Sequence, residues 1–194
     1  MKTNIRTGII KSAIKLFLQK GFFNTTVDEI ARSAKIAKGT VYLYFKDKSE
    51  IYIEIIKEQL NSAHEDLMEI KSENLNSTEK LRKIAEKWLC HSVDLHRLFP
   101  VLNTDNVNQA LRIMKGIKIK VFPIINSIIT EVKAMIEQGI KNGEFRDVDP
   151  QVAALYFLNI IRTPFLLKIF SAKKTVCGDE VIELFFDGLN KKRS

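Results

Sequence analysis

Two short helical patterns joined by a tight connection constrain the fold of this chain more than any other feature. The first begins at Thr26, where a threonine followed three positions later by Glu29 forms a capping box. It ends near Ala34, and a second pattern runs from residue 38 to residue 45. Residues 35–37 between them leave room for only one tight turn. Two short helices with this spacing predict a helix-turn-helix.

Longer helices are predicted on both sides of this pair. Before it, residues 4–20 carry apolar side chains at helical spacing and end at Gly21. After it, Asp47 and Glu50 form a second cap pattern that starts a helix reaching about Ser72. We assign to the core of this region four apolar residues: Phe17, Ile30, Val41 and Phe45.

The remainder of the chain also has the periodicity of helices. With 8 glycines and 4 prolines in 194 residues, it has little material for the turns of an all-β fold. We expect Pro123 and Pro164 to kink or split two of the helices. The predicted fold is all-α, with a helix-turn-helix domain at 1–48 and a helical effector-binding and dimerisation domain at 49–194. The helices expected in the second domain lie at about 77–96, 107–141, 150–170 and 179–189.

The positive charge of the chain is concentrated at its N-terminal end. Residues 1–48 hold ten basic residues against three acidic ones, which gives +7 of the total formal charge of +8. Neutralisation of phosphates by lysine and arginine supplies most non-specific affinity for nucleic acid. A basic segment joined to a near-neutral body therefore favours a partner that is a polyanion, although a solvated basic face has the same charge.

Other features exclude several classes of protein. Cys90 and Cys177 are the only cysteines, too few for a disulfide scaffold or a zinc finger, and they fit a reducing compartment. The longest charge-free stretch, 151–161, is well short of the roughly 20 apolar residues that span a bilayer. We therefore expect a cytoplasmic protein with no membrane partner, no metal site and no cofactor.

The helix-turn-helix region resembles the DNA-binding domain of the TetR family of bacterial transcriptional regulators. The resemblance covers about residues 5–55 and is carried by residues 25–31 (TTVDEIA) and 37–48 (AKGTVYLYFKDK). It implies that the helix at 38–45 enters the major groove of double-stranded DNA. It further implies a homodimer on a palindromic operator and a C-terminal domain that binds a small-molecule effector. Repression is the default in this family. We expect the effector to shift the fourth helix and so to move the two DNA-reading helices of the dimer out of register with the operator.

The resemblance also assigns roles to individual residues. Lys38 and Thr40 would reach base edges, and Leu43 would contact a thymine methyl group. The tyrosines at 42 and 44 would contact the DNA backbone, with packing against the first helix as their alternative role. The complete DNA-binding set is Thr26, Ala37, Lys38, Gly39, Thr40, Tyr42, Leu43, Tyr44 and Lys48.

Three positions depart from the family pattern. Lys35 stands where many relatives have glycine, in a turn that commonly needs a positive φ, and Ala37 stands where many have a capping serine. Each departure is expected to cost about 1 kcal/mol. Val27 lacks the hydroxyl group with which some relatives bind a phosphate.

The C-terminal half is expected to dimerise and to hold the effector. Its last two long helices carry more apolar side chains than one core needs, among them Leu155, Phe157, Leu158, Ile161, Phe185 and Phe186. Arg162 interrupts the most apolar helix and should pair with a carboxylate, of the protein in preference to a ligand. The apolar helices favour an apolar or amphipathic effector. The predicted pocket residues are Trp88, His91, Phe99, Phe122, Asn126, Tyr156, Asn159 and Arg162.

An enzyme is the rival interpretation, and it rests on Cys90, His91 and Asp94. Adjacent residues diverge by about 100° on a helix, so a nucleophilic pair of Cys90 and His91 is badly arranged. His91 and His96 are five positions apart, which does not suit a metal. We therefore predict a regulator without catalytic activity. Two alternatives remain open: a regulator that needs its ligand as co-repressor or activator, and a helical interaction module.

Overall fold

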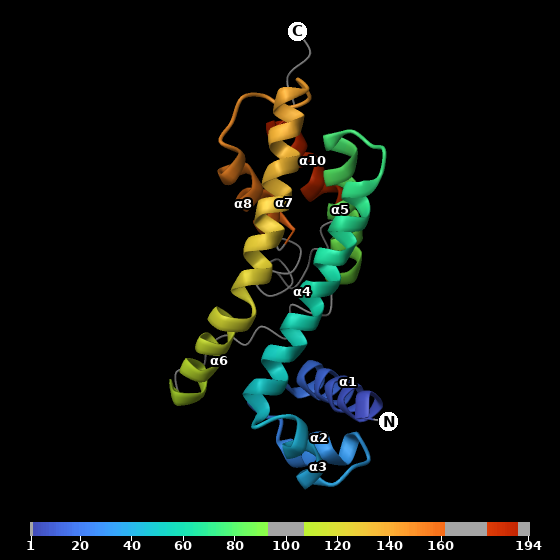
Figure 1. Ribbon diagram of the computed structural model, residues 1–194, viewed down its shortest axis with the longest axis vertical. Coiled ribbons are helices and arrows are strands. Elements are labelled where there is room, and N and C mark those ends of the chain that lie inside the picture. The colour runs from blue at the N-terminus through green and yellow to red at the C-terminus, as the bar shows by residue number, and fades with distance from the viewer. Residues whose placement is uncertain (1, 93–106, 162–177, 190–194) are drawn as a thin grey trace. The chain divides into compact units, whose positions relative to one another are not determined.

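The computed structural model describes residues 2–92, 107–161 and 178–189, and each element within these ranges is a helix (Figure 1). The predicted all-α class is confirmed. None of the described helices is long and apolar enough to cross a membrane. The helices are α1 (Lys2–Lys20), α2 (Val27–Ser33), α3 (Lys38–Tyr44), α4 (Lys48–Ser72), α5 (Ser77–Ser92), α6 (Val107–Lys120), α7 (Phe122–Lys141), α8 (Pro150–Ile160) and α10 (Gly178–Leu189).

Local sequence signals account for most helix boundaries. The capping box is formed: the Thr26 hydroxyl oxygen accepts the Glu29 N–H, and the Glu29 carboxylate accepts the Thr26 N–H. The proline at 123 splits the predicted helix at 107–141 into α6 and α7. Asp149 caps α8, whose first residue is a proline. The predicted continuation of α8 to residue 170, with Pro164, lies outside the described residues.

The chain divides into two compact units. Unit 1 comprises Met1–Asn61 with Asp94–Ile124, and unit 2 comprises Ser62–Val93 with Ile125–Ser194. The helices α4 and α7 each contribute residues to both units. The functional boundary drawn at residue 48 stays a prediction, because it concerns roles and not compactness.

Unit 1 has an aromatic core under the helix-turn-helix. The rings of Phe17, Phe22 and Tyr52 contact one another, with edge-to-face packing between Phe17 and each of the other two. All four core residues predicted from sequence are buried. Helix α6 approaches α4 closely, since a Cβ atom at Gly116 would lie 2.2 Å from the side chain of Ile53.

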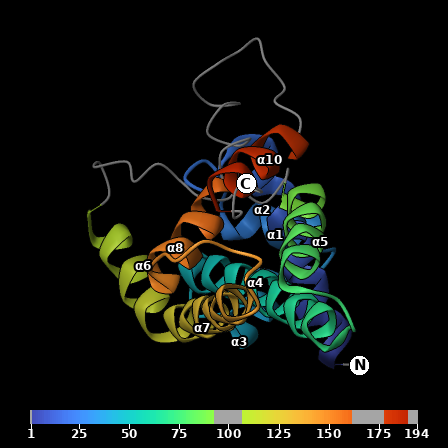
Figure 2. The same cartoon turned by 90° about the horizontal axis from the view of Figure 1, so that it is seen from above.

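In unit 2, α10 packs against α5 and α8 (Figure 2). Arg82 of α5 forms a bidentate ion pair with Glu183 and lies over the ring of Phe186. The sequence placed the surplus apolar side chains at six positions, and this is corrected in part. Four of the six are buried within unit 2: Phe157, Ile161, Phe185 and Phe186. Leu155, also one of the six, is exposed, and together with the exposed Val152, Tyr156 and Leu184 it forms the surface called here the α8–α10 apolar face.

Candidate DNA-binding surface

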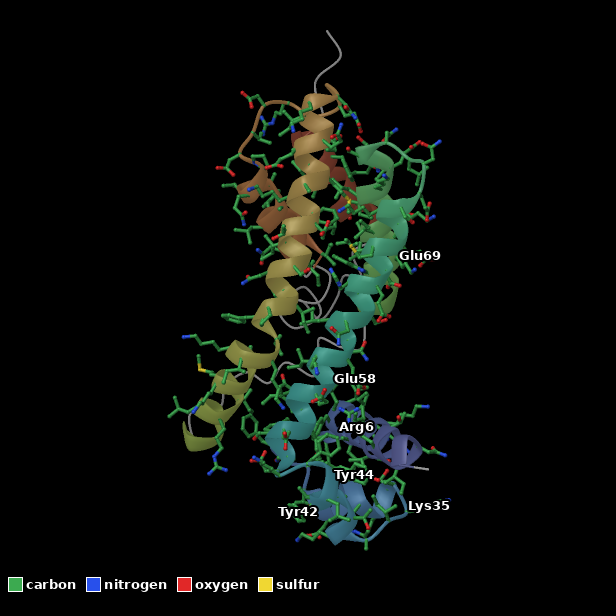
Figure 3. All side chains as sticks on the ribbon, in the orientation of Figure 1. Arg6, Lys35, Tyr42, Tyr44, Glu58 and Glu69 are labelled. Atoms are coloured by element: carbon green, nitrogen blue, oxygen red, sulfur yellow. The ribbon has the colours of Figure 1, made fainter. Side chains whose placement is uncertain are left out.

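Helix α3 has one buried side and one exposed side. Val41 and the residue that ends the helix, Phe45, are buried against the unit 1 core. On the other side, Tyr42 is 48% exposed and Leu43 is 83% exposed, and Figure 3 shows Tyr42 at the outer edge of the helix. Tyr42 is therefore not a core residue. We call the exposed residues Lys38, Gly39, Tyr42 and Leu43 the α3 outer face.

The start of α3 is open to an approaching molecule. Ala37 is the N-cap and makes no side-chain hydrogen bond to the helix, as its sequence predicted. A Cβ atom at Gly39 would meet nothing within 4 Å. No close packing within the described chain therefore requires glycine here. Without a side chain at this position, the backbone at the start of α3 can be approached closely by a partner molecule.

Lys38, the first residue of α3, forms an ion pair across to α2. Its Nζ atom lies 2.9 Å from Oδ2 of Asp28, and the two side chains are 50% and 53% exposed. The hydrogen bond from the ammonium group to Asp28 raises the pKa of Lys38, so the lysine stays protonated at neutral pH. Asp28 was not among the residues predicted from sequence. The available signal was an acid in the first turn of α2 beside a basic first residue of α3.

Lys48, for which the family resemblance implies a contact with the DNA backbone, points inward in the described chain. Its ammonium group donates to the carbonyl oxygens of Phe22, Phe23 and Thr25 at 2.7, 3.2 and 2.7 Å. It also lies 4.5 Å from the centre of the Phe22 ring. Burial lowers the pKa of Lys48. All three protons of the ammonium group are thus used to tie the α1–α2 connection to the start of α4.

The remaining predicted DNA-binding residues lie around α3 in several environments. Thr40 and Tyr44 are half-buried. The hydroxyl group of Thr26 is engaged in the capping box and donates to the Glu29 carboxylate as well. Lys35, which is exposed, has a φ of 57°, so the positive φ predicted for this turn is confirmed (Figure 3).

The predicted effector pocket is not brought together by the described residues. Phe122 and Tyr156 are exposed, as are Asn126 and Asn159, so their assignment to an inner face was wrong for the isolated chain. Helical periodicity identified their faces but could not tell which face is covered. Phe99, Arg162 and the side chain of His91 lie outside the described part.

Trp88 is the predicted pocket residue with an unusual environment. It is half-buried on α5, and its indole N–H is buried with no acceptor among the described residues. A buried donor without a partner costs free energy, which a ligand oxygen would recover. A separate depression of about 490 Å³ lies between α8 and α10, and Tyr156 is the only predicted residue that lines it. No cluster suited to a metal ion occurs in the described ranges.

Comparison with known proteins identifies the family. Residues 9–55 match the model of bacterial regulatory proteins of the tetR family. The HTH-type transcriptional regulator YhgD of Bacillus subtilis (strain 168) is 30% identical over 159 residues, which is 78% of each protein. The chain belongs to the TetR family. Its members are transcriptional regulators and not enzymes, and they bind DNA and small-molecule effectors, as the sequence predicted.

Two further comparisons, one of sequence and one of structure, extend the likeness along almost the whole chain. The fatty acid metabolism regulator protein of Bacillus subtilis (strain 168) is 25% identical over 188 residues, 95% of each protein. The crystal structure of FadR from Bacillus subtilis in complex with stearoyl-CoA superposes with a TM-score of 0.74 at 23% identity. That superposition covers 94% of this chain and 98% of the FadR chain. The fold of both halves is therefore that of a TetR-family regulator.

Proposed function

We propose that this TetR-family regulator is a cytoplasmic repressor that binds a palindromic operator as a homodimer and leaves it when a long-chain acyl-CoA binds. The observation that carries the DNA-binding part is the α3 outer face, where a lysine, a glycine and a tyrosine are exposed on a helix whose other side is buried. These residue types contact base edges and phosphates in the major groove. The remaining predicted DNA-binding residues stay part of this proposal, with Lys48 in a supporting position.

The α8–α10 apolar face supports the homodimer. Tyr156 is 59% exposed and Leu184 is 65% exposed, although both lie on helices whose other sides form the core of unit 2. Exposed apolar patches of this kind are typical of protein interfaces. A second copy would cover the face by two-fold symmetry and give two α3 helices for two half-sites.

The choice of an acyl-CoA rests on the relatives and on chemistry. One relative is named for fatty acid metabolism, and FadR was crystallised with stearoyl-CoA. An acyl-CoA is amphipathic, which is the class of effector that the apolar helices favour. The buried indole N–H of Trp88 supplies a donor suited to an oxygen of such a ligand.

Helix α4 provides a route by which the effector could act on DNA binding. It begins directly after the helix-turn-helix, and it contributes to both units. Within unit 1, α6 holds its start through the ion pair of Lys120 with Glu50. Within unit 2, α7 holds its second half through Lys71 and Glu131 and through a 3.0 Å contact of His64 with Ser127. A ligand that shifts α4 would change the spacing of the two α3 helices.

Selection of binding sites from random duplex DNA tests the DNA-binding part. We expect one inverted repeat to be enriched, and its affinity to fall steeply as salt rises. Tyr42→Ala should bind this repeat at least about tenfold more weakly, because each protomer loses a backbone contact, while its melting temperature stays unchanged. Ile119→Ala, a change to an exposed apolar residue off α3, is the comparison variant and should bind the repeat as the parent protein does. Failure of the parent protein to enrich any sequence would overturn the proposal.

Trp88 offers a separate assay for the effector, because it is the only tryptophan of the chain. Stearoyl-CoA should shift its fluorescence and release the protein from the selected repeat at the same concentrations. Free coenzyme A and stearate alone should do so only at much higher concentrations. Tighter DNA binding with stearoyl-CoA would instead favour the co-repressor alternative. No change in either signal would reject acyl-CoA as the effector class.

A further inference from the structure

Asp28 is an acid on a basic surface, and its described partner, Lys38, belongs to α3. The other two acids of residues 1–48 have roles within the fold. Glu29 caps α2 and pairs with Lys20, while Asp47 accepts the backbone N–H of Glu50 at the start of α4. Asp28 instead places Oδ2 at 2.9 Å from Nζ of Lys38.

Both members of this pair are available to DNA. About half of each side chain is exposed, and neither is held by another contact that the described residues show. Lys38 lies one helical turn before Tyr42, on the same side of α3. The ion pair therefore lies at the edge of the α3 outer face and not beneath it.

Building on the proposed function, we infer that Asp28 is a specificity-determining residue. It holds Lys38 in an ion pair that a well-placed base acceptor replaces and a phosphate group replaces less well. Binding to DNA of the wrong sequence is thereby weakened more than binding to the operator.

The physical reason is a difference between two kinds of DNA contact. Non-specific affinity comes from cations that neutralise phosphates, and an ammonium group already paired with a carboxylate contributes less to it. The carboxylate also repels phosphates that approach it. At the operator, a guanine can offer two acceptors to Lys38 in the major groove, which compensates for the broken pair. Discrimination by penalising the wrong partner is common at specific interfaces.

Asp28→Asn tests the inference on two duplexes, the selected inverted repeat and a scrambled sequence of the same length. Affinity for the scrambled duplex should rise about three- to tenfold, and its logarithmic salt dependence should steepen by about one per protomer. Affinity for the repeat should change less, so the specificity ratio falls by several fold. Asp28→Gln, a second neutral variant, should behave in the same way. The melting temperature reports separately on any loss of helix stability in α2.

Two controls separate this role from a general effect of charge. Glu65→Gln removes one exposed acid of α4 in unit 2 and should leave the specificity ratio unchanged. In a Lys38→Met background, Asp28→Asn should change the ratio less than twofold. An unchanged ratio in Asp28→Asn, or an equal fall with and without Lys38, would overturn the inference. A parent protein that selects no sequence would instead refute the proposed function.

Discussion

Two of the exposed surfaces of this chain differ in chemistry: the α3 outer face and the α8–α10 apolar face. The α3 outer face presents Lys38, Gly39 and Tyr42 with a single aliphatic residue, Leu43. The α8–α10 apolar face presents four large apolar side chains. Similar exposure therefore predicts different partners, a polyanion for the first face and an apolar surface for the second. The kind of side chain, and not its exposure, distinguishes a DNA contact from a dimer contact.

The forces at the two faces should also respond differently to conditions. Contacts with phosphates weaken steeply as salt rises, because bound DNA releases condensed counterions. Burial of apolar area depends little on salt and contributes about 1.5–3 kcal/mol for each large side chain that becomes fully buried. Mutations, salt and pH can therefore separate the two faces experimentally.

Of the predicted changes, Leu184→Asp should have the largest effect, and the quantity affected is the free energy of association. By two-fold symmetry both copies lose a buried leucine, so association should weaken by about 3–6 kcal/mol, and the buried charge adds to this. Sedimentation equilibrium measures the change, and affinity for the inverted repeat should fall with it. The melting temperature of the monomer should stay close to that of the parent, since Leu184 is exposed there.

Ile119→Asp is the matched control for this change. Ile119 is 63% exposed on α6, similar to Leu184, but it does not belong to the α8–α10 apolar face. It should leave association unchanged. Dissociation by Ile119→Asp but not by Leu184→Asp would show that the dimer uses a different surface.

Lys48→Met tests whether Lys48 contacts DNA beside the α3 outer face or only stabilises the fold behind it. Three backbone carbonyl oxygens lose a charged donor, so the free energy of unfolding should fall by about 2–3 kcal/mol, measured by urea denaturation. The salt dependence of DNA binding should stay the same. Lys46→Met, at an exposed neighbouring lysine, should leave stability unchanged. If Lys48→Met reduces the salt dependence and leaves stability intact, Lys48 contacts DNA as the family resemblance implies.

Helix ends could be predicted from the sequence, whereas the contacts of Lys48 could not. Helix ends were predictable because their signals are local: the capping box at Thr26, the proline at 123 and the Asp149–Pro150 pair all act within one turn. The partners of Lys48 lie more than 20 residues away in sequence and are brought to it by the packing of unit 1. The pair of Asp28 and Lys38 is only ten residues apart in sequence, but it joins two helices, and their relative orientation decides whether the two side chains meet.

The two candidate sites also differ in how far the sequence predicts them. The positive φ of Lys35 and the exposed side of α3 followed from a motif whose spacing fixes its geometry. The effector pocket has no such motif. Periodicity indicated that Phe122 and Tyr156 share faces with apolar residues, but the packing of whole helices decides which faces are covered. That information is distributed along the chain and cannot be obtained from one window of sequence.

Lys35→Gly should raise stability while it slightly lowers DNA affinity, and both effects should be smaller than those of the preceding variants. A lysine with a φ of 57° is strained, and glycine removes the strain, so the free energy of unfolding should rise by about 0.5–1 kcal/mol. The lost charge should weaken non-specific DNA binding slightly. Lys35→Asn tolerates the same backbone and should match the loss of affinity. A lower stability in both variants would show that the Lys35 side chain supports the turn.

The smallest effect is expected from Glu29→Gln, and it appears only in acid. The ammonium group of Lys20, followed by the N–H and hydroxyl groups of Thr26, lowers the pKa of Glu29 to about 2 from its ordinary value of 4.5. The unfolded chain therefore binds more protons than the folded chain between these two values. The contribution of Glu29 to stability is complete above about pH 4.5 and is lost as the pH falls towards 2. Solvent around this exposed pair keeps the effect modest.

The melting temperature of the parent protein should consequently fall more between pH 5 and pH 3 than that of Glu29→Gln, as calorimetry would measure. Glu65→Gln should retain the full dependence of the parent. The α8–α10 apolar face, as defined by its four residues, contains no carboxylate, so association should persist while the helix-turn-helix loses stability. If Glu29→Gln has the same acid dependence as the parent, the capping box does not stabilise α2 through charge. The apolar core of unit 1, and not the charge of Glu29, would then stabilise the helix-turn-helix that carries the α3 outer face.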